Sequence, residues 1–325
     1  MFEELGSIGN LLILIAALVA LNRASNLTIT HSVKVAGATG LGKTAVGFIL
    51  VAFSTSLPEL FVAIFAIIEP ENVGVSIGNV LGSNIANICL VLGIIFVLIA
   101  LKYSDNAKFL PAMAKEETGG LYFALLVASV IPLALLYIGS ASYVIGAILL
   151  AVFIYNLYQL SKTRNVKGEP CLGEESRKLK KYVMIAVLGA AGVVASAYFI
   201  VETASYIALS AGIPKLVIGA TIVAIRTSLP ELVTSIDSIK KGHADLAIGN
   251  IVGSCFMNIT LILGITLIAA PFRVDIAAFS ELIIFSLVAN LFLRHFLSNE
   301  KIGWREGATL LFIYALFLAT RVSSG

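Results

Sequence analysis

The stretch RTSLPE, residues 226–231, places an arginine and a glutamate inside a long apolar run. A nearly identical stretch, STSLPE, occupies residues 54–59. A charged side chain in the middle of a membrane span costs roughly 2.5–3.5 kcal/mol on insertion scales, so each charge there needs a compensating partner. Because the motif occurs twice, the explanation concerns the organisation of the whole chain.

The composition is that of a membrane protein. Of the 325 residues, 59% are hydrophobic and 13% are charged, and the mean hydropathy is +1.00. A soluble domain of this size needs more polar surface than this. Apolar runs long enough to cross a hydrocarbon core of roughly 30 Å recur along the chain, which favours helices over a barrel. We therefore predict an all-α, multi-pass protein of the cell membrane.

Ten transmembrane helices fit the hydropathy pattern. Of the 22 Lys and Arg residues, all lie in loops on one side except Lys215, Arg273 and Arg321 on the other side and Arg226 within the membrane. Positive charge marks the cytoplasmic face, so both termini are expected outside the cell. The expected spans are residues 7–30, 44–68, 74–101, 119–137, 141–161, 182–211, 214–239, 244–270, 275–293 and 304–321.

Two blocks of sequence are repeated. Residues 41–60 match residues 213–232 at ten of twenty positions, and residues 77–94 match residues 248–265 at eleven of eighteen. Each half holds five expected spans, and this odd number inverts one half relative to the other, as is typical of secondary transporters. The predicted organisation is a first repeat at 1–161, a cytoplasmic loop at 162–181 and a second repeat at 182–325.

Oxygen-bearing side chains gather around the two glutamates. Glu59 and Glu231 each follow a proline, which removes a backbone donor and is expected to kink its helix and free carbonyl oxygens. Carboxylates, carbonyls and hydroxyls suit a hard cation and can supply the six to eight oxygens that Ca²⁺ takes. The other candidate ligands in the two repeats are Thr55, Ser56, Ser83, Asn87, Thr227, Ser228, Ser254 and Asn258.

Other residues of the repeated blocks suit helix packing. Asn79 and Asn250 are as compatible with hydrogen bonds between helices as with a cation contact. Glycines on the third and eighth spans would allow a close approach to the proline-containing helices. These glycines are Gly78, Gly82, Gly249 and Gly253.

The paired TSLPE motifs, each followed one span later by GN, GS and N, resemble the α-repeats of the Ca²⁺/cation antiporter superfamily. The similarity is greatest to its prokaryotic sodium/calcium exchanger-like branch and covers nearly the whole chain. It implies that Glu59 and Glu231 hold a central Ca²⁺ with the backbone carbonyls of Thr55 and Thr227. It also implies flanking Na⁺ sites made by the carbonyls of Ala52 and Ala224 and by Ser83 and Ser254, with Ser56 and Ser228 nearby.

Two features depart from the family pattern. Asn258 stands where sodium-coupled members commonly have aspartate, and its pairing with Asn87 is similar to the proton-coupled branch. Ser54 and Arg226 stand where a glycine usually precedes the threonine. The permanent charge of Arg226 either packs against another helix or snorkels outward, or it blocks one flanking cation site.

These features predict a secondary antiporter that exchanges Ca²⁺ for Na⁺ or H⁺ by alternating access, normally exporting Ca²⁺. The alternatives are a cation channel, a non-transporting scaffold and an exchanger for another cation whose Ca²⁺ binding Arg226 has altered. Enzymatic chemistry is not expected, because no nucleophile and base pair is evident in the sequence. The expected partners are the lipid bilayer and the transported cations, without a cofactor, a nucleic acid or a required oligomer.

Overall fold

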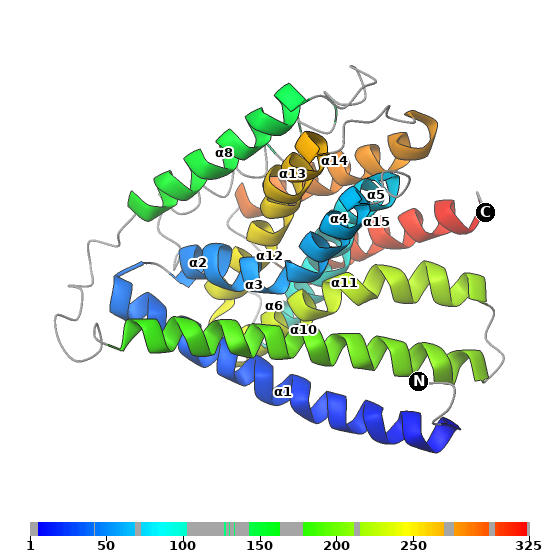
Figure 1. Ribbon diagram of the computed structural model, residues 1–325, viewed down its shortest axis with the longest axis horizontal. Coiled ribbons are helices and arrows are strands. Elements are labelled where there is room, and N and C mark those ends of the chain that lie inside the picture. The colour runs from blue at the N-terminus through cyan, green and yellow to red at the C-terminus, as the bar shows by residue number, and fades with distance from the viewer. Residues whose placement is uncertain are drawn as a thin grey trace.

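The computed structural model describes residues 6–41, 43–68, 73–102, 143–162, 178–210, 215–269, 276–298 and 303–323, together with the isolated positions 127, 130 and 133. All regular elements assigned within these ranges are helices, as the composition predicts. Figure 1 shows them gathered into one bundle.

The helices of the first repeat are interrupted more often than those of the second. The first series comprises α1 (Gly6–Thr39), α2 (Lys43–Val46), η1 (Gly47–Val51), α3 (Ala52–Thr55), α4 (Leu57–Ile68), α5 (Val73–Ile85), η3 (Ala86–Leu92), α6 (Gly93–Lys102) and α8 (Tyr143–Lys162). The second comprises α10 (Leu179–Ser210), α11 (Lys215–Lys240), α12 (Ala244–Met257), η5 (Asn258–Ile262), α13 (Leu263–Ala269), α14 (Ile276–Ser298) and α15 (Trp304–Ser323). The η segments are π-helical.

Described helices cover nine of the ten expected spans. The remaining expected span, residues 119–137, lies almost entirely outside the described residues, so the count of ten stays a prediction. The largest boundary error is at the first span, expected to end at residue 30, because α1 continues to Thr39. Polar residues in this last part of α1 lower the hydropathy without ending the helix.

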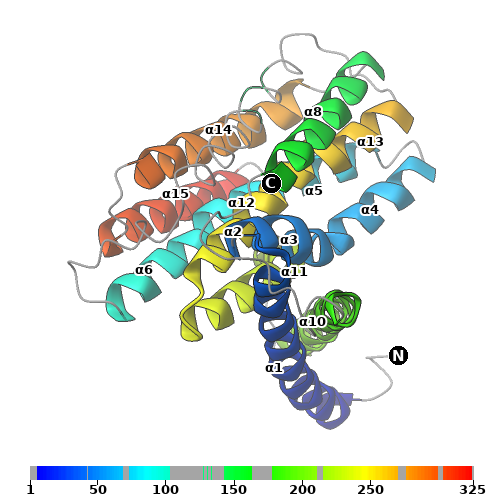
Figure 2. The same cartoon turned by 90° about the vertical axis from the view of Figure 1, so that its left-hand side faces the viewer.

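The two longest described helices, α1 and α10, lie side by side along one edge of the molecule (Figures 1 and 2). Their close contact uses a glycine, because a Cβ on Gly189 would lie 2.7 Å from Thr28 Oγ1 and 2.8 Å from its backbone nitrogen. At 34 and 32 residues each helix is about 50 Å long. That length exceeds an apolar core of roughly 30 Å, so both helices tilt or extend beyond it.

Apolar side chains cover the outer surfaces of several helices. Ile8 of α1 is 78% exposed, Ile154 of α8 is 66% exposed and Leu188 of α10 is 63% exposed. By length and composition, four described helices could cross a membrane, and the bent pair 43–55 with 57–64 provides a fifth candidate. Lipid is the environment in which such surfaces are stable, and the chain is a multi-pass membrane protein.

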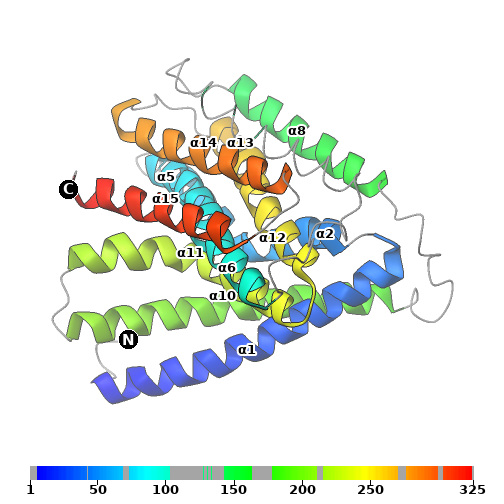
Figure 3. The ribbon, with the colours of Figure 1, turned by 180° about the vertical axis from the view of Figure 1, so that it is seen from behind.

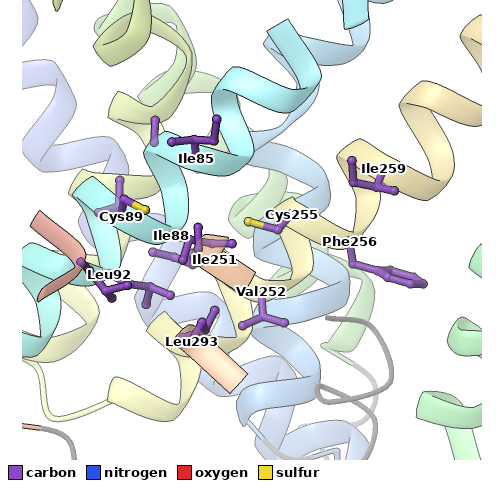
Figure 4. Close-up of a cluster of buried hydrophobic side chains, with 14 of the residues drawn as sticks. Ile85, Ile88, Cys89, Leu92, Ile251, Val252, Cys255, Phe256, Ile259 and Leu293 are labelled. Atoms are coloured by element: carbon purple, nitrogen blue, oxygen red, sulfur yellow. The ribbon is translucent and has the colours of Figure 1, made fainter. Parts of the chain in front are cut away.

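The core joins the two repeats at their second matching block. Figure 4 shows Ile88 and Cys89 of η3 close to Ile251 and Cys255 of α12, with Leu293 of α14 at the edge. These side chains are fully buried. α5, η3, α12 and η5 therefore form the packed centre, and the helices that carry Pro58 and Pro230 pack against it. In the view from behind, α12 lies near the middle of the bundle (Figure 3).

Candidate cation site

Ser56 interrupts the helix that carries the first TSLPE motif. α3 ends at Thr55, Ser56 has φ −85° and ψ 9°, and α4 begins at Leu57. The two helical segments are bent by 46°. Pro58 has no N–H to donate to the carbonyl of Ser54, which favours a break at this point. The kink predicted for the first repeat is confirmed.

The helix that carries the second motif is different. α11 runs from Lys215 to Lys240 as one helix with Pro230 inside it, so the proline does not divide this helix as Pro58 divides the first. Side chains of residues 221–227 lie outside the described part of the chain. The roles expected of Ala224, Arg226 and Thr227 therefore stay predictions.

The two glutamates of the motifs are both buried and belong to one site. Glu59 is 1% exposed and Glu231 is 0% exposed, and they lie close enough for their charges to interact. Ser254 Oγ donates a hydrogen bond to Glu231 Oε1 over 3.2 Å. Ser83, the counterpart of Ser254, lies beside Glu59. The two repeats thus bring their carboxylates together.

The hydroxyls of the first motif lie next to the carboxylate of the other repeat. Thr55 and Ser56 are beside Glu231. Thr55 Oγ1 is 3.3 Å from Asn250 Oδ1, to which it can donate a hydrogen bond. The hydroxyls of the first repeat are therefore shared with the carboxylate of the second repeat.

Asn250 makes hydrogen bonds to both repeats at this contact. Its Nδ2 donates to Thr234 Oγ1 and Ser235 Oγ on α11, each over 3.2 Å, while its Oδ1 faces Thr55. Of the two readings that the sequence left open for Asn250, the hydrogen bond between helices is the one observed. The amide fixes the position of the first motif against the second repeat.

The second matching block lines the site from the other side. Ser83 and Asn87 of the first repeat, and Ser254 and Asn258 of the second, are all buried. η3 starts one residue before Asn87 and η5 starts at Asn258, so both repeats change to π-helix at the same place. π-Helical segments within α-helices frequently occur at functional sites. Hydropathy and residue type do not predict these segments, and the repetition is their only mark in the sequence.

Several buried oxygens of this region lack a hydrogen-bond partner among the described residues. Leaving a buried polar group unsatisfied costs about 1–3 kcal/mol, so a cluster of such atoms indicates a ligand that satisfies them together. Carboxylate, hydroxyl and amide oxygens fit a hard cation. The oxygens are Glu59 Oε1 and Oε2, Glu231 Oε2, Ser56 Oγ, Ser228 Oγ, Asn87 Oδ1 and Asn258 Oδ1.

The cation would depend largely on neutral oxygens. Within the described ranges, no group of three or more His, Cys, Asp and Glu side chains could hold a metal ion. The two glutamates are therefore supplemented by hydroxyls and amides.

Glycine allows one side of the site to pack closely. A Cβ on Gly253 of α12 would lie 2.7 Å from the carbonyl oxygen of Phe48 in η1, and one on Gly249 would overlap the backbone of Thr44. The predicted close approach is therefore present for α12. For Gly78 and Gly82 of α5, no such neighbour exists among the described residues.

The sequence analysis missed Asn84. Its Nδ2 donates to the carbonyl oxygen of Cys255 over 3.2 Å, and its Oδ1 accepts from Asn258 Nδ2 over 3.2 Å. Asn84 and Cys255 occupy matching positions of the two repeats, so this contact lies where the repeats meet. Asn84 is not repeated in the second half of the chain, because its counterpart there is a cysteine, so the repeat did not predict it.

Comparison with known proteins agrees with this architecture. A family model described as sodium/calcium exchanger protein matches residues 9–161 and 181–323. The chain belongs to this family. Its members are transporters, so the family is not one of enzymes.

Several relatives are similar over most of the chain. The sodium/calcium exchanger MaX1 of Methanosarcina acetivorans is 31% identical, over 95% of this chain and 97% of the relative. The Ca²⁺/H⁺ antiporter ChaA of Bacillus subtilis is 30% identical, over 83% of this chain and 81% of the relative. A solved structure of the sodium-calcium exchanger NCX_Mj, soaked with 10 mM Na⁺ and zero Ca²⁺, has a TM-score of 0.81 at 26% identity and covers 96% of this chain and 99% of that one.

Proposed function

We propose that this member of the sodium/calcium exchanger family is an antiporter that exchanges Ca²⁺ for a monovalent cation, Na⁺ or H⁺, by alternating access. The observation that carries the proposal is the meeting of two buried carboxylates, Glu59 and Glu231, one from each repeat, among unpartnered oxygens. The relatives named as a sodium/calcium exchanger and as a Ca²⁺/H⁺ antiporter support this class of transport.

Exchange follows from the electrostatics of the site. Two ionised carboxylates away from water are costly, so the site cannot change sides of the membrane empty. One Ca²⁺ neutralises both carboxylates when the site changes from facing the cytoplasm to facing the outside. Monovalent cations or protons neutralise them on the return, and each ion competes with the other for the same oxygens. Coupled exchange is the consequence.

The proposed ligands are divided between a central and a flanking position. Glu59 and Glu231 hold Ca²⁺ at the centre, together with the carbonyl oxygens of Thr55 and Thr227. The monovalent cations use oxygens on either side. These are supplied by the backbone of Ala52 and Ala224 and by the side chains of Ser56, Ser83, Asn87, Ser228, Ser254 and Asn258.

Alternating access needs a moving part. α1 and α10 are suited to this role, because they pack along each other at one edge while the site-bearing helices form the packed centre (Figure 1). In the proposed topology ten helices cross the membrane, and both termini are outside. The pair formed by α1 and α10 slides across the centre and exposes the site to one side at a time.

The proposal is tested by ⁴⁵Ca²⁺ uptake into proteoliposomes under an imposed Na⁺ gradient, an imposed H⁺ gradient or neither. Uptake is expected only when one of the gradients is present, and Glu59→Gln and Glu231→Gln should each remove it. Glu281→Gln, which changes a glutamate of α14 outside the proposed ligand set, serves as the matched control and should retain uptake. Ca²⁺ entry without any counter-ion gradient would indicate a channel and contradict exchange.

A further inference from the structure

The two polar atoms of the Asn258 side-chain amide differ in their hydrogen bonding. Its Nδ2 donates to Asn84 Oδ1 over 3.2 Å, whereas its Oδ1 is buried and has no hydrogen-bond partner among the described residues. An amide can present either its oxygen or its nitrogen to a cation, and only the oxygen is a ligand. The bond to Asn84 therefore decides which end is available.

Asn84 is itself held in a fixed orientation. Its Nδ2 donates to the carbonyl oxygen of Cys255, one turn before Asn258 on the same helix. This second bond leaves Asn84 Oδ1 as the acceptor that faces Asn258. Asn84 is 0% exposed, so water does not compete for either bond. The two bonds together make the orientation of Asn258 dependent on a residue of the other repeat.

The first repeat has no equivalent arrangement. Asn87 is the counterpart of Asn258, and the residue in the position corresponding to Asn84 is Cys255. Asn87 lies near the Cys255 side chain, but a thiol is a weak hydrogen-bond partner. Both polar atoms of the Asn87 amide are without a hydrogen bond among the described residues. The two halves of the site therefore differ in how firmly their amides are oriented.

We propose that Asn84 is a positioning residue that orients Asn258 so that its Oδ1 faces the transported cation, a role that Cys255 does not provide for Asn87. This inference rests on the proposed exchange function. It assigns to the second repeat the pre-organised amide ligand and to the first repeat an amide whose neighbour is only a weakly bonding thiol. Asn84 touches no cation itself, and its whole effect passes through Asn258.

A double-mutant cycle tests this role through the KM and maximal rate of Ca²⁺ uptake in proteoliposomes. Asn84→Leu and Asn258→Ala should each raise the KM for Ca²⁺ about tenfold, with a smaller change in maximal rate. The double variant should have the same KM as Asn258→Ala alone, because Asn84 has nothing left to orient. Asn84→Asp keeps an acceptor oxygen for Asn258 and should retain most of the affinity.

The outcomes separate this inference from the exchange proposal. Additive effects of the two substitutions on KM, or an unchanged KM in Asn84→Leu, would show that Asn84 supports only packing. An unchanged KM in Asn258→Ala would also overturn the inference, while exchange itself would stand. If Asn84→Leu does not give a monodisperse protein, Asn84→Ser replaces it in the double-mutant cycle, with the same expected effects on KM. Failure of the wild-type protein to take up Ca²⁺ under any gradient would instead contradict the proposed function.

Discussion

At the scale of single residues, the two glutamates of the site differ in whether their carboxylate oxygens accept a hydrogen bond. Glu231 accepts a hydrogen bond from Ser254, while Glu59 has neither carboxylate oxygen bonded among the described residues. Sequence repetition identified both glutamates and both serines as candidates. It could not show that Thr55 and Ser56 lie beside Glu231 of the other repeat, because spacing along one helix contains no information about a partner helix.

Ser254 is expected to hold the Glu231 carboxylate in place for the cation. Ser254→Ala removes a hydrogen bond to a charged group, which is worth about 1.5–3 kcal/mol. The KM for Ca²⁺ should therefore rise about tenfold or more in proteoliposome uptake. Ser238→Ala is the matched control, since Ser238 is buried on α11 and its hydroxyl, among the described residues, donates to the Thr234 carbonyl of its own helix. Equal effects of the two substitutions would contradict this role of Ser254.

At the scale of helices, hydropathy predicted where spans lie but not how they are interrupted. The break at Ser56 was expected in outline from Pro58, whereas α11 continues through Pro230 although its motif has the same TSLPE letters. The π-helical segments η3 and η5 also had no signal in hydropathy. Both features depend on the helices packed against the motif, so local sequence does not determine them.

The contact between α12 and the first repeat depends on glycine. Gly253→Ala places a methyl group 2.7 Å from the Phe48 carbonyl oxygen, and that backbone cannot move without shifting η1. The overpacking should cost about 1–3 kcal/mol, measured as a lower unfolding temperature in detergent. Gly37→Ala on α1 is the control, because its Cβ would have no neighbour within 4 Å. A stability for Gly253→Ala equal to that of Gly37→Ala would contradict close packing here.

The turn between α11 and α12 is expected to respond to pH. Lys43 Nζ of α2 donates to His243 Nδ1 over 3.0 Å, which requires that nitrogen to be unprotonated. Burial lowers the pKa of His243, and the charges of Lys43 and Lys241 lower it further against an opposing effect of Asp245. The folded state favours neutral histidine. The contribution of His243 to the free energy of unfolding is therefore fully present above about pH 6.5 and is lost as the pH falls below that value.

His243→Gln tests this pH dependence. The wild-type unfolding temperature should fall between about pH 7.5 and about pH 5.5, and the fall should be smaller in His243→Gln, because the variant has no imidazole to protonate. Thermal unfolding in detergent at both pH values measures the difference. An equal fall in both proteins would assign the effect to other groups.

At the scale of the whole molecule, the two repeats together form the candidate site, and the distribution of Lys and Arg predicts the orientation in the membrane. Cys89 and Cys255 are buried, and the third cysteine, Cys171, belongs to the segment expected in the cytoplasm. The repeat could be recognised from sequence because eleven of eighteen positions agree across one block. Orientation rests on Lys and Arg alone, and it remains a prediction.

Cys171 offers a native probe of that orientation. A membrane-impermeant maleimide should label the protein only after the cells are opened, because residues 162–181 are expected in the cytoplasm. Labelling should disappear in Cys171→Ser, which leaves the two buried cysteines unchanged. Labelling of intact cells would place this loop outside and reverse the proposed topology.

Equilibrium binding of ⁴⁵Ca²⁺ to the purified protein tests most directly whether the two repeats share one divalent-cation site through Glu59 and Glu231. One Ca²⁺ should bind per chain, and either Glu59→Gln or Glu231→Gln alone should abolish saturable binding over the wild-type concentration range. Binding that persists at half the stoichiometry in each single variant, or that is unchanged in either, would contradict a shared site.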